Sequence, residues 1–275
     1  MINYFKQSIR RKIARRYTRE YPATINDYTL DKDGDVQFAN WDNPLVPEIR
    51  IDQGTIDFFR QFIKEGDLVI DIGTNIGDTT VPMGIAAGAS GMTLGFDPNP
   101  CVFKILEINA LLNKDKSNII PYRYAVTVED EEFYFISSEA SFANGGISQN
   151  RDSKHGRFIY PEKVKGVNLM DFLNLNHESW LPKLSFIKVD AEGYDKEILK
   201  SLSKLIEKYK PVLVAESFGD NSDSEKLELY DIIQKHGYKL FYFSDFDINA
   251  KTLELKSRDD IVRWKETINV YSVPL

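Results

Sequence analysis

A short apolar segment that runs directly into a glycine-rich turn constrains this chain more than any other feature. Residues 65–77 read EGDLVIDIGTNIG, and the apolar, β-branched character of residues 68–72 is typical of a parallel strand buried on both faces. Gly73 and Gly77 allow the backbone to approach a ligand closely, and the helix that follows offers free N–H groups to an anionic group. The pattern predicts a nucleotide-like ligand at the end of this strand.

Two polar residues indicate which ligand this is. A dinucleotide-binding turn, G-x-G-x-x-G, needs its second glycine where the pyrophosphate packs against the backbone, and Asn75 stands at that position. A hydrogen-bonding residue there, with Asp71 at the end of the strand, suits a ligand that carries an ammonium and a carboxylate group. We therefore expect S-adenosylmethionine. An NAD-dependent oxidoreductase is the alternative from another enzyme class.

A second acidic residue follows the next apolar run. Residues 92–96 form that run, and it leads into Asp97-Pro-Asn-Pro100. An acid at the end of the second strand is placed to accept hydrogen bonds from both hydroxyls of a ribose, and Pro100 suits the first turn of a helix. Asp71 or Asp97 alone can equally well cap a helix or end a strand, but the two at this spacing predict nucleoside binding.

Strand and helix patterns alternate along most of the remaining chain. The expected elements are helices at residues 55–64, 77–87, 100–113, 194–207 and 224–236, and strands at residues 119–125, 131–136, 183–189, 212–215, 238–243 and 268–273. This alternation predicts an α/β fold with a mainly parallel, doubly wound sheet. In such sheets ligands bind beyond the carboxyl ends of the strands, where the turns described above lie.

Two segments fall outside this alternation. Residues 1–54 read as an N-terminal extension with a hairpin near residues 33–34, ahead of a main domain at residues 55–275. Residues 137–166 are polar, and excursions of this length inside a domain are usually functional or disordered. We expect this insertion to recognise the acceptor, with a disordered surface loop as the alternative. Its candidate contacts are Phe142 and Tyr160, which can stack on a sugar, and Arg151, which can meet an acidic group.

Residues 1–16 contain six cationic and no acidic side chains, although the whole chain carries a net charge of −7. Apolar residues recur there at helical spacing, at Ile2, Phe5, Ile9 and Ile13. Such a helix can rest on an anionic membrane surface or an assembly partner, or it can pack on its own domain with a solvated basic face. The acidic remainder argues against a nucleic-acid partner, because phosphate binding needs a broad basic surface.

Further features bear on the cellular compartment. The single cysteine, Cys101, cannot form an internal disulfide, and residues 1–16 lack the apolar core of a cleavable signal. The uncharged residues 79–96 are long enough to raise the question of a membrane span, but Pro82 and four glycines interrupt them, so a helix and a buried strand are expected. We expect a cytoplasmic protein, and the amphipathic segment allows peripheral contact with the inner face of the membrane.

Over residues 67–217 the chain resembles the FkbM-type methyltransferase family. The resemblance rests on residues 69–77, 96–100 and 187–193, which read VIDIGTNIG, FDPNP and IKVDAEG. The chain departs from the usual family pattern at Thr74, where alanine is usual, at Asp97, where glutamate is usual, and at Met170-Asp171, where two acids are usual. A shorter acid at position 97 should still reach a ribose.

The resemblance implies a Rossmann-like class I methyltransferase fold with an antiparallel C-terminal strand, and an S-adenosylmethionine-dependent O-methyltransferase. It implies an acceptor hydroxyl of a glycan or a natural product, and a sugar in a surface polysaccharide or glycolipid is the leading expectation. The adenine is expected beside residues 123–127. The expected cofactor-binding residues are Asp71, Gly73, Asn75, Gly77, Asp97 and Val126. A methyltransferase fold that serves only as a binding module is the alternative outside catalysis.

Methyl transfer requires the donor carbon and the acceptor oxygen to lie in line, and a proton to leave the acceptor. Asp190, Glu192 and Glu216 follow two strands that should be neighbours, and they are the predicted catalytic residues. Three acids at one site are costly unless a cation balances them. Either Asp190 and Glu216 hold Mg²⁺, as in some methyltransferases that this pattern resembles, or one carboxylate is a general base without a metal. The metal-free alternative is favoured.

Three further residues have functional and structural interpretations. Lys188 lies in an apolar strand, where a lysine more often pairs with a structural acid or extends to solvent than acts in a site. His155 and His177 can each deprotonate a hydroxyl, but such histidines are more often ordinary surface residues. We therefore expect the carboxylates to carry the chemistry.

Overall fold

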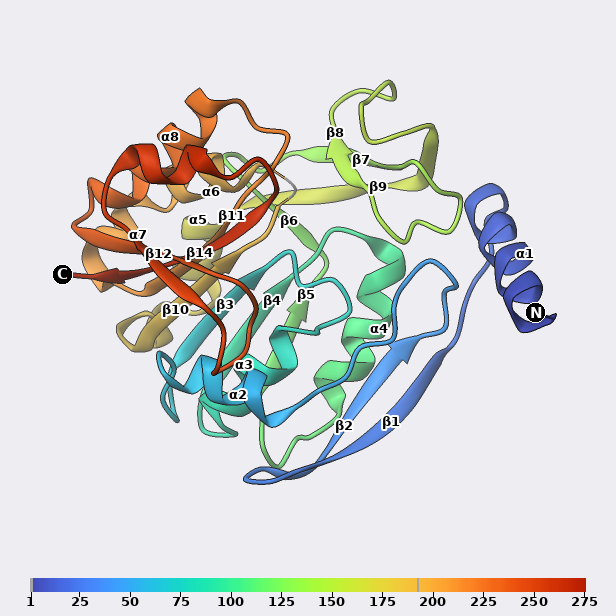
Figure 1. Cartoon of the computed structure of the whole chain (residues 1–275), viewed down its shortest axis with the longest axis horizontal. Helices are drawn as coiled ribbons and strands as arrows, with labels where there is room; N and C mark the ends of the chain where they lie inside the picture. Colours follow the sequence, from blue (N-terminus) through green and yellow to red (C-terminus); the bar gives the residue numbers. More distant parts are fainter. Residues whose placement is uncertain (1, 192) are drawn as a thin grey trace.

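The computed structural model describes residues 2–191 and 193–275, without the side chains of residues 2–4. Its centre is an eight-stranded sheet in the order β13-β12-β14-β11-β10-β3-β4-β5 (Figure 1). The strands are β3 (Leu68–Ile72), β4 (Met92–Phe96), β5 (Ile119–Tyr122), β10 (Leu184–Val189), β11 (Val212–Ser217), β12 (Tyr238–Phe243), β13 (Thr252–Leu255) and β14 (Ile268–Pro274). The pairs from β5 to β11 are parallel, and those that add β14, β12 and β13 are antiparallel. The topology confirms the expected fold class.

Apolar side chains alternate between the two faces of this sheet. In β3, Ile70 and Ile72 belong to one hydrophobic cluster and Val69 to another. The first cluster is covered by α5 (Leu169–Asn176), α6 (Asp195–Ser201), α7 (Ser203–Tyr209) and α8 (Asp223–Gln234), and the other face by α2 (Gln53–Arg60), α3 (Thr80–Ala87) and α4 (Pro100–Leu111). Two 3₁₀ helices are η1 (Glu178–Lys183) and η2 (Arg258–Arg263). Burial of both faces explains why the parallel strands are so uniformly apolar.

Capping residues and one break set the helix bounds. The side chain of Asn99 accepts a hydrogen bond from the amide of Cys101 at 3.0 Å, and Pro100 occupies the first turn of α4. Ser222 and Glu225 form a capping box at the start of α8. The helix expected at residues 194–207 is two helices, α6 and α7, which are separated at Leu202.

The strands β1 (Ala23–Leu30) and β2 (Gly34–Trp41) form the expected hairpin. Asn109 of α4 is fully buried and ties this hairpin to the main sheet. Its side-chain amide donates to the carbonyl oxygens of Ala39, at 3.0 Å, and Ile76, at 2.7 Å, and accepts from the amide of Ala39 at 2.7 Å. Because a buried amide must satisfy its hydrogen bonds, Asn109 holds the hairpin against the glycine-rich turn.

The expected insertion at residues 137–166 forms β8 (Gly146–Ser148) and most of β9 (Phe158–Asn168), which belong to a second sheet rather than a loop. The other strands of this sheet are β6 (Tyr124–Thr127) and β7 (Glu132–Ser137), which confirms the strand expected at residues 131–136, and the order is β6-β9-β7-β8. The single strand expected at residues 119–125 is divided at Arg123, so that β5 lies in the large sheet and β6 in the small one. In β9, Glu162, Lys163 and Lys165 occupy exposed positions, which is why the segment resembles a polar loop in the sequence.

The helix α1 (Ile2–Arg16) confirms the helical periodicity near the start of the chain. It lies at the edge of the molecule beside the loop that joins β7 and β8, where the amide of Ala140 donates to the carbonyl oxygen of Arg15 at 3.2 Å (Figure 1). Residues 79–96 supply α3 and β4, as expected. Among the residues that the structure describes, no helix has the length and apolar character needed to span a bilayer.

Candidate active site

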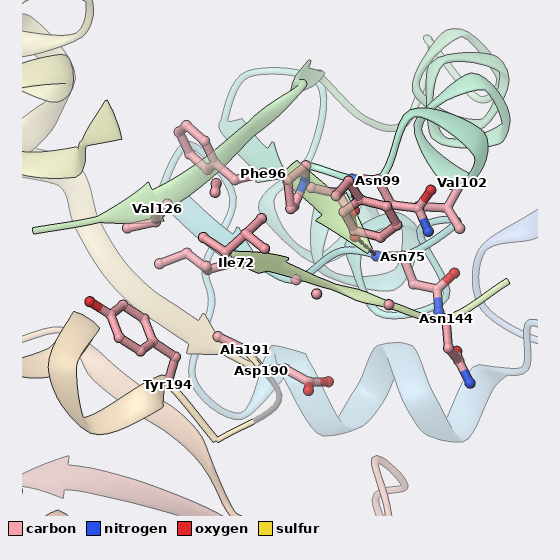
Figure 2. A pocket seen from close by; sticks show the side chains of 18 of the residues that line it. Ile72, Asn75, Phe96, Asn99, Val102, Val126, Asn144, Asp190, Ala191 and Tyr194 are labelled. Carbon is pink, nitrogen blue, oxygen red and sulfur yellow. Dashed lines mark hydrogen bonds between the residues drawn. The ribbon is translucent and has the colours of Figure 1, made fainter. Parts of the chain in front are cut away.

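A cavity of 560 Å³ lies where the carboxyl ends of β3, β4 and β10 meet (Figure 2). Its walls include Ile72, Phe96 and Asp190 from these strand ends. Residues 143–149, which comprise β8 and the residues on either side of it, supply another part of the wall. The volume is within the range of small-molecule sites, so one cavity joins the large sheet to the insertion.

The turn after β3 requires glycine at its first position. Gly73 has a φ of +79°, and the carbonyl oxygen of Asp190 lies in the space that a Cβ on Gly73 would occupy. Asn75 also adopts the left-handed conformation, with a φ of +48°, which asparagine tolerates better than most residues. The amide of Gly77 donates to the carbonyl oxygen of Thr74 at 2.8 Å and closes the turn. The turn therefore touches the segment after β10 and presents Asn75 to the cavity.

Asp97 follows β4 directly, and its carboxylate accepts hydrogen bonds from two backbone amides. The amide of Asn75 donates to Oδ2 and that of Asn99 to Oδ1, each at 2.8 Å. The residue is 7% exposed, and its burial raises the pKa of Asp97 to about 7 although the two amides act to lower it. Each carboxylate oxygen has a second lone pair, so Asp97 can still accept from a ligand hydroxyl. Its assignment to the ribose stays a prediction.

Asp71 is fully buried at the end of β3. Its Oδ2 accepts hydrogen bonds from the hydroxyls of Thr79, at 3.0 Å, and Thr80, at 2.7 Å, and its Oδ1 lies 3.3 Å from Nζ of Lys188. A buried carboxylate needs such partners because an isolated charge is costly away from water. Asp71 is absent from the cavity wall as the described residues form it, so it supports the turn from behind. Its expected contact with the cofactor stays a prediction.

Lys188 is the cation that balances the acids of this site. Its Nζ lies 3.3 Å from Oδ1 of Asp71, 3.3 Å from Oδ2 of Asp190 and 3.4 Å from the carbonyl oxygen of Gly73. Burial lowers the pKa of Lys188, but the carboxylates of Asp71, Asp190 and Asp78 outweigh it and raise the pKa above its usual value. Burial also raises the pKa of Asp78 to about 6. Lys188 therefore stays charged, pairs with a structural acid as expected, and also lines the cavity.

The structure places the predicted catalytic carboxylates differently. Asp190 lines the cavity, with its side chain 44% exposed. Glu216 follows the paired residues Val189 and Ala215, so its backbone lies beside that of Asp190, but among the described residues it does not form part of the cavity wall. Glu192 lies outside the described residues.

The charges around Asp190 bear on the expected metal. Within residues 2–191 and 193–275, no group of three or more His, Cys, Asp or Glu side chains is arranged to hold a metal ion. The ammonium of Lys188 already lies between the carboxylates of Asp71 and Asp190, where it supplies the balancing positive charge. The Mg²⁺ expected at Asp190 and Glu216 therefore stays a prediction, and Lys188 offers another source of the balancing charge.

Asp195 positions the two strand ends and was not predicted from the sequence. It is 2% exposed, and its carboxylate accepts from the amide of Glu216 at 3.0 Å and from that of Ala191 at 3.2 Å. Burial raises the pKa of Asp195 to about 7. The carboxylate of Asp195 therefore links two segments, the one that follows β10 and the end of β11. The only signal in the sequence is an acid in the first turn of a helix, which the helix dipole alone would explain.

The predicted adenine segment lines one part of the cavity. Residues 124–127 belong to the wall, and Figure 2 shows Val126 on the same side of the view as Phe96 and Tyr194. Behind this wall, the ring of Phe96 stacks on that of Tyr122, with centroids 5.3 Å apart. An apolar and aromatic wall suits a flat base. The assignment of Val126 to the adenine stays a prediction.

The loop between β8 and β9 brings Lys154 and His155 to the cavity wall. The ring of His155 lies against Gly146, in the space that a Cβ there would occupy. Burial and the neighbouring Lys154 lower the pKa of His155, so its imidazole is neutral at neutral pH. The sequence favoured an ordinary surface residue, because the contact with Gly146 forms only when the second sheet folds.

The described cavity wall does not include Phe142, Tyr160, Arg151 or His177. Phe142 is 3% exposed and packs near Phe135, with ring centroids 6.4 Å apart, so the expectation that it stacks on a sugar is wrong. The hydroxyl of Tyr122 lies 2.9 Å from Nε2 of His177, which is buried. The guanidinium of Arg151 lies over the ring of Tyr134, 5.2 Å from its centroid.

Comparison with known proteins adds a family and several relatives. The model of the methyltransferase FkbM domain matches residues 71–240. The hexuronic acid methyltransferase AglP of Haloferax volcanii is 26% identical over 183 residues, which are 66% of this chain and 70% of that protein.

Two solved structures are similar at lower identity. The methyltransferase FkbM from Methylobacillus flagellatus is 13% identical with a TM-score of 0.46, and the match covers 77% of this chain but 44% of that one. This chain therefore spans less than half the length of that protein. A SAM-dependent O-methyltransferase from Thermotoga maritima is 9% identical with a TM-score of 0.42, over 92% of this chain and 78% of that one.

Proposed function

The chain belongs to the methyltransferase FkbM family, and on this premise we propose that it transfers a methyl group from S-adenosylmethionine to a hydroxyl of an acidic sugar in a glycan or glycolipid. One observation carries the proposal, namely the division of charge within a single cavity. Asp97 and Asp190 line it at the strand ends beside the buried Lys188, whereas Lys154 is the cation that lines it from the loop between β8 and β9. A hydroxyl of a natural product is the second acceptor class.

The residues at the strand ends fit the proposed methyl donor. S-adenosylmethionine carries its methyl group on a positively charged sulfur, so that transfer is a direct displacement. We assign Asp97 to the ribose, residues 124–127 to the adenine, and the turn at Asn75 to the methionine portion. Asp71 and Lys188 hold that turn in place from behind. The buried carboxylate of Asp97, with acceptor positions to spare, supports this assignment because it suits a pair of hydroxyl donors.

The proton of the acceptor hydroxyl needs a base. We propose Asp190, because it lines the cavity and is partly exposed. Glu192 and Glu216, which the sequence puts near the ends of the same two strands, remain further candidates. His155 is the second candidate. It also lines the cavity, and its lowered pKa leaves a ring nitrogen free to accept a proton at neutral pH. No metal step is part of the proposal, because Lys188 already supplies the cation beside Asp190.

The charge of the insertion supports an acidic acceptor. Lys154 lines the cavity, and Arg151 and Arg157 lie in the same loop, although the chain as a whole has a net charge of −7. A cation in a cavity of an acidic protein favours an anionic ligand over its neutral counterpart. The relative AglP is named for a hexuronic acid, which is a sugar of this kind.

The direct test is a methylation assay with matched sugars. Purified chain and S-adenosylmethionine are incubated with glucuronides or with the corresponding glucosides, and products are detected by mass spectrometry. We expect a singly methylated glucuronide, formed faster than any glucoside product, and loss of that preference in Lys154→Ala. Equal rates on both sugars would exclude the acidic acceptor. Calorimetry with S-adenosylhomocysteine and NAD separates the alternatives: binding of NAD alone indicates an oxidoreductase, and cofactor binding without any turnover indicates a binding module.

A further inference from the structure

Helix α1 turns its apolar side away from the protein. Phe5 is 60% exposed and Ile9 is 57% exposed, and with Ile13 they form an apolar stripe at a spacing of four residues. Ala14 comes nine residues after Phe5, which is about two and a half helical turns, so the two side chains lie on opposite sides of the helix. Ala14 is fully buried. The apolar stripe is therefore not the side by which α1 packs on its own domain.

Hydrogen bonds join α1 to its own domain. The carbonyl oxygen of Arg15 accepts a hydrogen bond from the amide of Ala140 at 3.2 Å. Nε of Arg11 donates to the carbonyl oxygen of Pro44 at 3.2 Å. These contacts and the burial of Ala14 fix the orientation of the helix, with its apolar stripe facing outward.

Cations surround the apolar stripe. The six cationic residues of α1 are all exposed, and its sequence contains no acidic residue. They are Lys6, Arg10, Arg11, Lys12, Arg15 and Arg16. The whole chain has a net charge of −7, so α1, which has six cations and no acid, is a positively charged helix on an acidic chain. An apolar face flanked by lysine and arginine is the arrangement with which helices lie in the plane of an anionic bilayer surface.

We propose that α1 binds the surface of an anionic phospholipid membrane, with Phe5 and Ile9 at the boundary of the acyl chains and the cations among the headgroups. This inference goes beyond the proposed methyl transfer. A nucleic acid would pair with the cations but would leave both apolar side chains in water. A bilayer accounts for the charge and for the exposed apolar stripe together.

The position of α1 connects this surface to the candidate active site. Ala140, which contacts the end of α1, lies three residues before Ala143, and Ala143 and Asn144 line the cavity. Figure 1 shows α1 beside this loop, at the end of the molecule that carries the second sheet. If the proposed function is right, a membrane-bound α1 brings the acceptor part of the cavity close to sugars that are attached to lipids.

Co-sedimentation of the full chain with vesicles tests the proposal. We expect the chain to bind vesicles of phosphatidylcholine and phosphatidylglycerol about tenfold or more tightly than vesicles of phosphatidylcholine alone, with binding that weakens as salt is added. The double substitution Phe5→Ser and Ile9→Ser should reduce binding about tenfold. The matched control is Leu175→Ser with Leu253→Ser, because these leucines are 85% and 54% exposed on other elements. The control should bind as the unchanged chain does.

A charge series gives a second, independent measurement. Lys6→Glu with Lys12→Glu should abolish binding, whereas Lys235→Glu with Lys251→Glu, at exposed positions elsewhere, should not. Thermal unfolding and S-adenosylhomocysteine calorimetry on each variant check its fold and report separately on the proposed methyl transfer. Three results would overturn the proposal: vesicle binding that does not depend on phosphatidylglycerol, α1 variants that bind vesicles as tightly as the unchanged chain, or binding to RNA without binding to vesicles.

Discussion

The backbone amide of Asn75 donates a hydrogen bond of 2.8 Å to Oδ2 of Asp97. This bond joins the turn after β3 to the residue after β4, so the segments that we assign to the two halves of the donor cannot move independently. The same carboxylate is buried, and its pKa is raised to about 7. The charge of Asp97 therefore changes within the ordinary range of assay conditions.

Cofactor affinity should depend on pH through Asp97. Below its raised pKa the carboxyl is protonated and loses acceptor capacity, so binding of ribose hydroxyls should weaken as the pH falls. We expect the affinity for S-adenosylhomocysteine to fall about tenfold from about pH 8 to about pH 6, as measured by calorimetry. Asp97→Asn should bind weakly at all pH values, and Asp115→Asn, at an exposed site, should behave as the unchanged chain does. A pH-independent affinity in the unchanged chain would contradict the assignment.

Gly73→Ala should destabilise the fold more than the same change elsewhere. Both Gly73 and Gly34 have positive φ values, +79° and +66°, so alanine at either should cost about 1–2 kcal/mol in backbone strain. At Gly73 the Cβ would also overlap the carbonyl oxygen of Asp190, whereas nothing lies within 4 Å at Gly34. We expect about 1–3 kcal/mol of additional loss from this overlap, measured by urea unfolding. Equal losses in the two variants would contradict the observed contact.

Lys188→Met should be strongly destabilising, because it leaves Asp71 buried without its cation. Breaking a buried pair in this way costs about 3–5 kcal/mol in the free energy of unfolding. Adding Asp71→Asn to Lys188→Met should recover part of that loss. The control is Lys104→Met at the exposed pair with Glu20, which should cost less than about 1 kcal/mol. Urea unfolding of these three variants and of the unchanged chain measures each loss in the free energy of unfolding, and a small loss in Lys188→Met would show that the pair does not support the turn.

The pH dependence of turnover should identify the base. The pKa of His155 is lowered by burial and by Lys154, so if His155 is the base, kcat/KM should fall only at pH values below the ordinary imidazole pKa of 6.5. Asp190→Asn should lower kcat by about 10²–10⁴-fold if Asp190 is the base, and His155→Gln should then leave the shape of the profile unchanged. Loss of the acidic limb in His155→Gln, with activity retained in Asp190→Asn, would reverse the assignment. Glu192→Gln tests the third carboxylate in the same assay.

Much of the fold could be predicted because the strands of the large sheet carry their own signals. The apolar runs at β3 and β4 are short, end in acids, and precede recognisable helix starts such as Pro100. The turn at Gly73 was equally visible. These strands, turns and helix starts depend on residues that are neighbours in the sequence, so they can be predicted from one chain.

The remaining parts depend on contacts between distant residues. Lys188 reads as an ordinary strand lysine until Asp71 is brought beside it from more than a hundred positions away. The strand β9 looks polar because only one of its faces is covered. Asp195 and the contact of His155 with Gly146 acquire meaning only after the loops have folded. Contacts between residues so far apart in the sequence cannot be predicted from local patterns in one chain.

At Arg123 the chain passes from the large sheet to the small sheet, so the cavity is built from both sheets. The large sheet brings Ile72, Phe96 and Asp190 to the cavity at its strand ends, and the small sheet, which begins at Tyr124 and has its own core, supplies residues 124–127 and 146–148 to the same cavity. Because we assign residues 124–127 to the adenine, substitutions in β8 should alter the choice of acceptor with less effect on cofactor affinity than substitutions in β6.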